Sequence, residues 1–168
     1  AAANGGLDSE TTEAALGLRV QPWRKVPLAF DVERRFALGA FSRDAWAARV
    51  SGGSAGETRL AGRRLKMDGY GEAGVIGFTG DPALYGGAQM WAGTPVVQLG
   101  QVAIDGGAGM WGAAQRDYGT TVSRFDLGPS ARFQVQPWPF KAQVDYRVRA
   151  AGNAAPGSGP VITLSGEF

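Results

Sequence analysis

The sequence predicts an all-β protein: an antiparallel up-and-down transmembrane β-barrel, with about 8 to 10 strands in this chain. Five segments alternate polar and apolar side chains with a period of two, which is the period of a β-strand. The 27 Gly, 5 Trp, 4 Tyr and 8 Phe are typical of antiparallel sheets with tight turns and aromatic bands. The sequence has no apolar run of the roughly 18 residues that a transmembrane helix needs.

The alternation is clearest in residues 140–150, where apolar side chains hold every even position and polar ones every odd position. Residues 14–22, 26–36, 124–136 and 161–168 alternate similarly and predict four more strands. Four weaker segments, rich in Gly and Ala, cover residues 44–52, 66–78, 83–94 and 98–113. Together they predict about nine strands in a barrel domain at 11–168. Residues 1–10 predict a flexible segment, and the polar, Gly-rich residues 52–64 predict a loop.

The tetrapeptide VQPW occurs at residues 20–23 and again at 135–138, each time between two strongly alternating segments. We therefore expect one type of turn to be used twice. If the last strand ends at the periplasmic edge, both turns face the periplasm, and the membrane–water interface receives the aromatic residues Trp23, Trp138, Tyr146 and Phe168. Bacterial barrels normally have an even number of strands, so about nine predicts that further barrel strands lie outside this chain.

Alternation alone does not decide whether the apolar face meets lipid or a protein core. A soluble β-barrel or sandwich that binds a small apolar ligand is therefore the alternative. The polar face has few Lys and mixes Arg, Asp, Gln, Ser and Thr, which favours a hydrogen-bonded lumen. Predicted lumen-facing, ligand-binding residues are Arg19, Asp31, Glu33, Arg35, Arg124, Asp126, Arg132, Asp145, Arg147 and Arg149. These groups either bind a ligand in the lumen or, as we expect, pair with one another.

Several classes of function are excluded by composition. The chain has 0 His and 0 Cys, so a histidine-dependent triad and a thiolate metal site are both impossible. Residues 106–109 are Gly-rich but lack the Lys-Ser/Thr pair of a phosphate-binding loop. The net charge of +2 is scattered, which disfavours nucleic acid as a partner. We expect no enzymatic activity, no metal and no cofactor.

The chain ends in VITLSGEF, and it resembles Gram-negative outer-membrane proteins, whose last amphipathic strand commonly ends in Phe and is recognised by the barrel assembly machinery. The segments TEAALGLR (12–19), FDVERRFALG (30–39), DAW (44–46) and YGEA (70–73) also resemble the C-terminal barrel of the bacteriophage adsorption protein A family. That family consists of helical-repeat outer-membrane proteins related to cellulose exporters. The resemblance covers residues 11–168 or so and includes no catalytic motif.

The resemblance implies a location in the bacterial outer membrane, in contact with its lipid. It also implies export of an exopolysaccharide together with an inner-membrane glycosyltransferase, and in one lineage service as a phage receptor. The helical repeats that precede the barrel in this family do not occur in these 168 residues. The periplasmic part that would guide a polymer is therefore expected outside this chain.

Overall fold

A computed structural model of the chain describes residues 13–38, 44–78, 82–138 and 140–166. These residues form one antiparallel sheet in which every strand pairs with its neighbours in chain order, and none of them is helical. The strands are β1 (Glu13–Val20), β2 (Leu28–Ala37), β3 (Ala45–Leu60), β4 (Arg63–Ile76), β5 (Ala83–Leu99), β6 (Val102–Asp117), β7 (Thr120–Val135), β8 (Phe140–Gly152) and β9 (Gly159–Gly166). The predicted all-β class, the up-and-down order and the count of about nine strands are confirmed.

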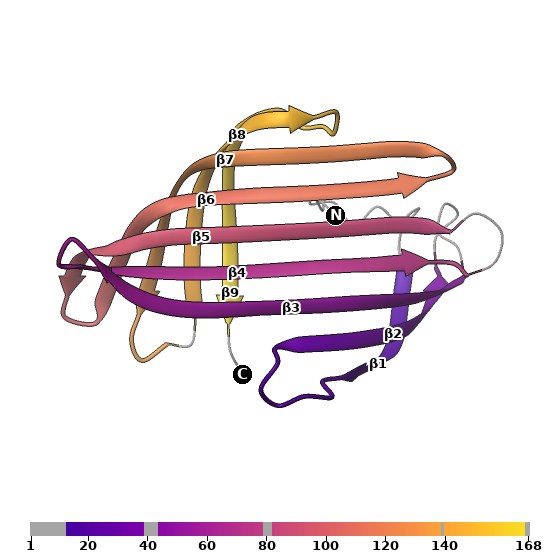
Figure 1. The fold of residues 1–168 in the computed structure, drawn as a ribbon, viewed down its shortest axis with the longest axis horizontal. Helices are drawn as coiled ribbons and strands as arrows, with labels where there is room; N and C mark the ends of the chain where they lie inside the picture. Colours follow the sequence, from indigo (N-terminus) through magenta and orange to yellow (C-terminus); the bar gives the residue numbers. More distant parts are fainter. Residues whose placement is uncertain (1–12, 39–43, 79–81, 139, 167–168) are drawn as a thin grey trace.

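The sheet is strongly curled (Figure 1). Strands β3 to β7 cross the front as long neighbouring arrows, β8 rises behind them and ends at the top of the view, and β9 runs down behind them. Strands β1 and β2 lie at the lower right. Within the described residues β1 pairs only with β2 and β9 only with β8, so the sheet is not closed into a complete barrel. Its curl nevertheless gives it an inner and an outer face.

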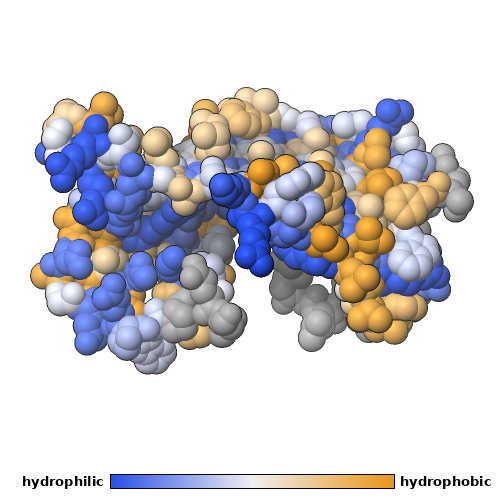
Figure 2. Space-filling model, turned by 60° about the horizontal axis from the view of Figure 1, so that its bottom comes forward, coloured by the Kyte–Doolittle hydropathy of each residue, from blue (hydrophilic) through white to orange (hydrophobic). Residues whose placement is uncertain are grey.

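Apolar side chains gather on the outer face, at alternate positions of the strongly patterned strands. In β7, for example, Phe125, Leu127 and Phe133 point outward and are 36–42% exposed. Figure 2 shows hydrophobic surface on the outer flanks of the molecule and a hollow between its two ends. The inner face carries the polar alternate positions, as β7 again illustrates with Asp126 and Ser130, both buried.

The described residues contain no packed apolar core of the usual kind. Buried apolar residues are four alanines and two tryptophans: Ala29, Ala45, Ala47, Ala83, Trp91 and Trp111. The largest side chains that are fully buried are instead polar: Asp126, Asp145 and Ser51. Soluble domains bury Leu, Ile, Val and Phe and expose Asp. This sheet therefore has the reverse distribution of polarity.

The prediction of a loop at residues 52–64 is wrong. Strands β3 and β4 continue through it in unbroken register, from Ala47 opposite Ile76 to Leu60 opposite Arg63. The hairpin turns at Ala61 (φ 50°) and Gly62 (φ 78°), the two successive positive φ values that a tight two-residue turn requires. In β3 this stretch carries polar or small residues on both faces, so the backbone ladder forms without an alternating sequence pattern.

The two VQPW turns lie at the same end of the sheet, because they follow β1 and β7 and all odd strands of this meander run in the same direction. We call it the VQPW end. In each turn the tryptophan contacts a phenylalanine of the next strand: Trp23 lies 6.2 Å from Phe30 and Trp138 lies 6.5 Å from Phe140, measured between ring centroids. The predicted flexible segment 1–10 lies outside the described residues.

Candidate functional site

The polar inner face is the candidate site, and the structure places nine of the ten predicted lumen residues on it as buried or partly buried side chains. The tenth, Arg19, lies on edge strand β1 and its side chain is 60% exposed. The inner residues occur at alternate positions because a strand sends successive side chains to opposite faces. Many of the inner residues belong to one of two groups, one centred on Asp145 and one on Arg49, and the others form separate pairs.

The first group, the Asp145 network, consists of Asp68, Ser130, Arg132, Gln143, Asp145 and Arg147. Asp145 is fully buried and accepts hydrogen bonds from Ser130 Oγ (2.6 Å), Gln143 Nε2 (2.8 Å) and Arg147 Nη2 (3.2 Å). These three hydrogen bonds replace the ones that the carboxylate would make with water.

Arg132 extends this network across the interior from β7 to β4. Its Nη2 donates to Asp68 Oδ1 at 3.0 Å, its Nη1 donates to the other oxygen of the same carboxylate, and its Nε donates to Gln143 Oε1 at 2.7 Å. A guanidinium bound to both oxygens of one carboxylate is the most directional ion pair that side chains form. The network therefore fastens β4, β7 and β8 together through the interior.

Two tryptophan rings on the inner face lie under the arginines of this network. The guanidinium of Arg132 lies 3.8 Å from the ring centroid of Trp91, and that of Arg147 lies 4.3 Å from the ring centroid of Trp111. Both rings lie on the backbone of a glycine of their own strand, because a Cβ atom at Gly93 or Gly109 would overlap them. These glycines provide the space in which large rings lie flat against the inner wall.

The second group, the Arg49 cluster, consists of Asp31, Arg49, Tyr70 and Glu72 on β2, β3 and β4. Arg49 lies between two carboxylates, with Nε 3.3 Å from Asp31 and Nη1 3.5 Å from Glu72. The hydroxyl of Tyr70 donates to the same oxygen of Glu72 at 2.9 Å. Of the predicted residues, only Asp31 belongs to this cluster, while Glu33 and Arg35 pair with each other at 2.8 Å.

Sequence reasoning missed the contribution of β4. Lys66, Asp68, Tyr70 and Glu72 all face inward, and Lys66 Nζ lies 2.7 Å from Asp105 of β6. Polar side chains alternate at even positions 66–72 and could have indicated this face, but of the outer positions between them only Met67 is large and apolar, while positions 69 and 71 are Gly. Arg49, Trp91 and Trp111 were missed for a similar reason, since their strands are rich in Gly and Ala and alternate weakly.

The interior is partly open. A cavity of ≈ 890 Å³ lies between β4–β7 on one side and residues 156–163 on the other, and its lining includes Glu72, Trp111, Asp126 and Arg147. Asp126 Oδ1 and Arg147 Nε are buried and have no hydrogen-bond partner among the described residues. One is an acceptor and the other a donor, and both belong to residues that line the cavity.

The connection between β8 and β9 is fastened across the end of β7. Asn153 receives a hydrogen bond from the backbone NH of Ser123 (2.8 Å) and donates to the carbonyl of Thr121 (3.1 Å). Arg124, which is also paired with Asp126, donates to the carbonyls of Pro156 (3.0 Å) and Gly157 (3.2 Å). Arg149 also donates to the carbonyl of Pro156. Predicted lumen residues Arg124 and Arg149 thus hold residues 153–158 against the cavity.

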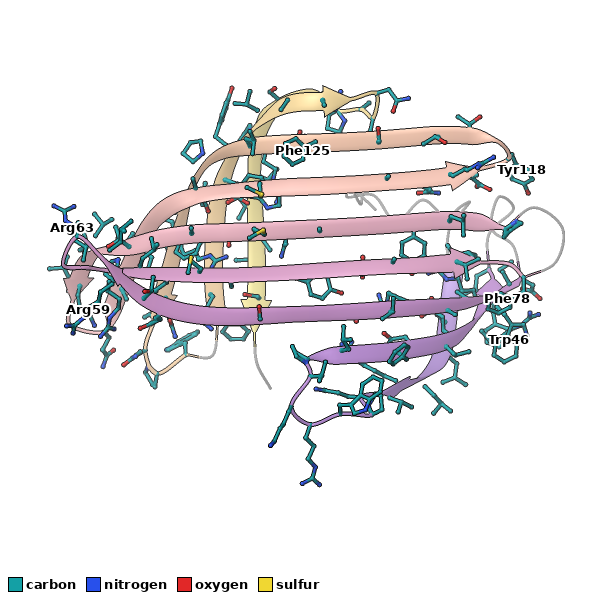
Figure 3. The ribbon with its side chains drawn as sticks, viewed as in Figure 1. Trp46, Arg59, Arg63, Phe78, Tyr118 and Phe125 are labelled. Atoms are coloured by element: carbon teal, nitrogen blue, oxygen red, sulfur yellow. The ribbon has the colours of Figure 1, made fainter. Side chains whose placement is uncertain are left out.

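The predicted interface aromatics occupy different levels of the outer face. Trp23 and Trp138 lie at the VQPW end and are 52% and 64% exposed, whereas Tyr146 lies near the middle of β8. Phe168 lies outside the described residues. Figure 3 shows further aromatic side chains, Trp46 and Phe78 together with Tyr118, at the opposite end of the sheet. Sequence reasoning did not select these.

The described residues contain no cluster of three potential metal ligands. No helix among them has the length and apolarity needed to cross a membrane. Comparison with protein-family models, curated proteins and solved structures finds no match. The function therefore has to be argued from the geometry described above.

Proposed function

We propose that this sheet crosses the outer membrane of a Gram-negative bacterium as part of a porin-like β-barrel. Its apolar outer face contacts lipid and its polar inner face surrounds a hydrated interior. The observation that carries the proposal is the reversed polarity of the sheet: large apolar side chains are exposed while Asp126 and Asp145 are buried. Transfer of a Leu, Val, Ile or Phe side chain from water to an apolar medium contributes about 1.5–3 kcal/mol.

Two further features support a membrane location. Antiparallel pairing satisfies the backbone NH and C=O groups of β2 to β8 within the sheet, as a lipid environment demands. Aromatic side chains lie at both ends of the outer face, with Trp23 and Trp138 at one end and Trp46 at the other. Aromatic belts at both membrane–water interfaces are typical of outer-membrane barrels. The VQPW end is then the periplasmic end.

The alternative of a soluble barrel that binds a small apolar ligand has less support. Such a protein requires an apolar interior, whereas the cavity here is bordered by Glu72, Arg124, Asp126 and Arg147. Its outer face would also have to place Leu16, Leu18 and many similar side chains in water.

The finer part of the proposal is that the barrel belongs to an exopolysaccharide exporter that also serves as a phage receptor. The resemblance to the bacteriophage adsorption protein A family motivates it. The hydrogen-bonding groups that line the cavity and the half-exposed ring of Tyr70 beside them support it, because sugars bind through their hydroxyl groups and against ring faces. The partners are then the polymer, an inner-membrane glycosyltransferase and the barrel assembly machinery.

Fractionation tests the coarser proposal. We expect the native protein to sediment with outer membranes, to resist extraction by sodium carbonate and to become monodisperse only in detergent. A protein that stays in the soluble fraction and is monodisperse without detergent contradicts it.

Export is tested separately by deleting the gene. The amount of polymer in the medium should fall and should return on complementation. Unchanged secretion of the polymer contradicts the finer proposal. Helical repeats of about 34 residues upstream in the full-length gene would support export.

A further inference from the structure

The two edges of the sheet differ from its middle. Strands β1 and β9 each lack a partner on one side within the described residues. Their outer side chains are the most exposed large apolar residues of the sheet: Leu18 is 78% and Leu164 77% exposed, against 42% for Leu127 between two neighbours. Proteins usually protect free edges with charges or with very short strands. The apolar outer face here continues unbroken to both edges.

The number of strands restricts how these edges are closed. In an antiparallel meander all odd strands run in one direction, so β1 and β9 run the same way. Direct pairing of β1 with β9 would therefore be parallel, and parallel pairing is slightly weaker per residue than the antiparallel pairing of the other eight ladders. Two copies inserted in the same orientation would also meet through parallel strands. A single strand placed between β1 and β9 makes every ladder antiparallel.

The inner side of the β1 edge indicates the charge of the missing neighbour. Arg19 is 60% exposed, and its nearest acidic contact is a long one, 3.9 Å from Nε to Asp31 Oδ1. Its Nη2 reaches Ser51 Oγ only at 3.5 Å. Asp31 is already bound to Arg49 at 3.3 Å. An acidic side chain from a neighbour on the free side of β1 would give the Arg19 guanidinium a close ion-pair partner.

We propose that one further strand, contributed by a segment of the same polypeptide outside Glu13–Gly166, lies between β1 and β9 and runs antiparallel to both. It carries apolar residues outward and polar residues inward, with an acidic residue facing Arg19. A segment of the same polypeptide is favoured over a separate chain because a separate chain loses translational and rotational entropy on binding. The lipid-facing pattern of this strand rests on the proposed function, whereas the strand direction rests on topology alone.

Photo-crosslinking in the full-length protein in its native membranes tests the proposal. The variants Leu16→benzoylphenylalanine and Ile162→benzoylphenylalanine place the probe on the outer face of β1 and β9. We expect both probes to crosslink to one and the same segment outside 13–166, identified by mass spectrometry. The matched control, Leu127→benzoylphenylalanine, should crosslink to β6 and β8, where Met110 and Val148 are its register partners.

The other outcomes overturn the proposal. A crosslink from β1 to β9 within one chain means direct parallel closure, a crosslink to β9 of another copy means closure by a second copy, and crosslinks to lipid alone mean an open edge. Carbonate extraction of the same membranes tests the proposed function separately. If the protein is extracted, the membrane proposal fails whatever the crosslinks are; if it stays and β1 crosslinks to β9, only the additional strand fails.

Discussion

Replacing Asp145 with alanine should be among the most destabilising single changes in this protein. The side chain is fully buried and accepts three hydrogen bonds, from Ser130 at 2.6 Å, Gln143 at 2.8 Å and Arg147 at 3.2 Å. Asp145→Ala leaves those donors unsatisfied and the Arg147 charge without its carboxylate. Removing one partner of a buried ion pair costs about 3–5 kcal/mol. We expect a loss of stability in that range.

The measurement is urea unfolding of the protein in lipid vesicles, followed by tryptophan fluorescence, because Trp111 lies under the guanidinium of Arg147. Asp44→Ala is the matched control: its side chain is 58% exposed, pairs with Arg34 at 3.5 Å and accepts a hydrogen bond from the exposed backbone NH of Ala37 at 2.8 Å. Surface contacts of this kind contribute about 0–1 kcal/mol each. The double variant Asp145→Ala/Arg147→Met should recover part of the loss, because it also removes the orphaned charge. If Asp145→Ala and Asp44→Ala have equal effects, the Asp145 network does not stabilise the interior.

Three further predictions concern the outer face, the glycines under the inner tryptophan rings and the β8–β9 connection. Leu127→Arg should lower the stability of the membrane-inserted form by about 2–4 kcal/mol, because it places a charge in lipid, and Leu127→Thr should lower it by less. Equal resistance of the two variants to heat unfolding, as seen on gels, would contradict contact between Leu127 and lipid. Gly109→Ala should lower stability by about 1–3 kcal/mol because the new methyl group overlaps the ring of Trp111. Gly56→Ala, whose methyl group meets open space, should change stability by less than about 0.5 kcal/mol. Equal unfolding temperatures of the two variants would show that the Trp111 ring does not lie against Gly109. Arg124→Met should free residues 153–158 and speed amide hydrogen exchange at Asn153 several-fold; unchanged exchange would mean that the other contacts of the connection suffice.

The strands near the two ends of the chain were predictable because their side-chain pattern is strong. In residues 140–150 of β8, apolar and polar residues alternate without exception, and the β-strand is the only regular structure that separates them. The middle of the sheet was harder. Strand β3 runs on to Leu60 through Gly, Ser and Thr, where the backbone ladder with β4 holds the structure and side-chain polarity carries little information.

The inward direction of the predicted lumen residues could be read from the sequence, but their partners could not. Arg132 binds Asp68, 64 positions away in the sequence, because the sheet curls and brings β4 opposite β7. Nothing in the local sequence of either residue indicates that the two side chains meet in space. The same holds for Lys66 and Asp105, which are 39 positions apart.

The sequence by itself determined the strand type of the strongly alternating segments and their division into a polar and an apolar face, since both depend on the period of two and on which side chains occupy it. Which of the two faces turns inward was decided by the curl of the sheet. Only the tertiary structure decided which charges meet, that Trp91 and Trp111 lie under arginines, and that β1 and β9 remain without partners on one side. The physical reason is that alternation is a local property of one strand, whereas curl, ion pairing and closure depend on all nine strands together.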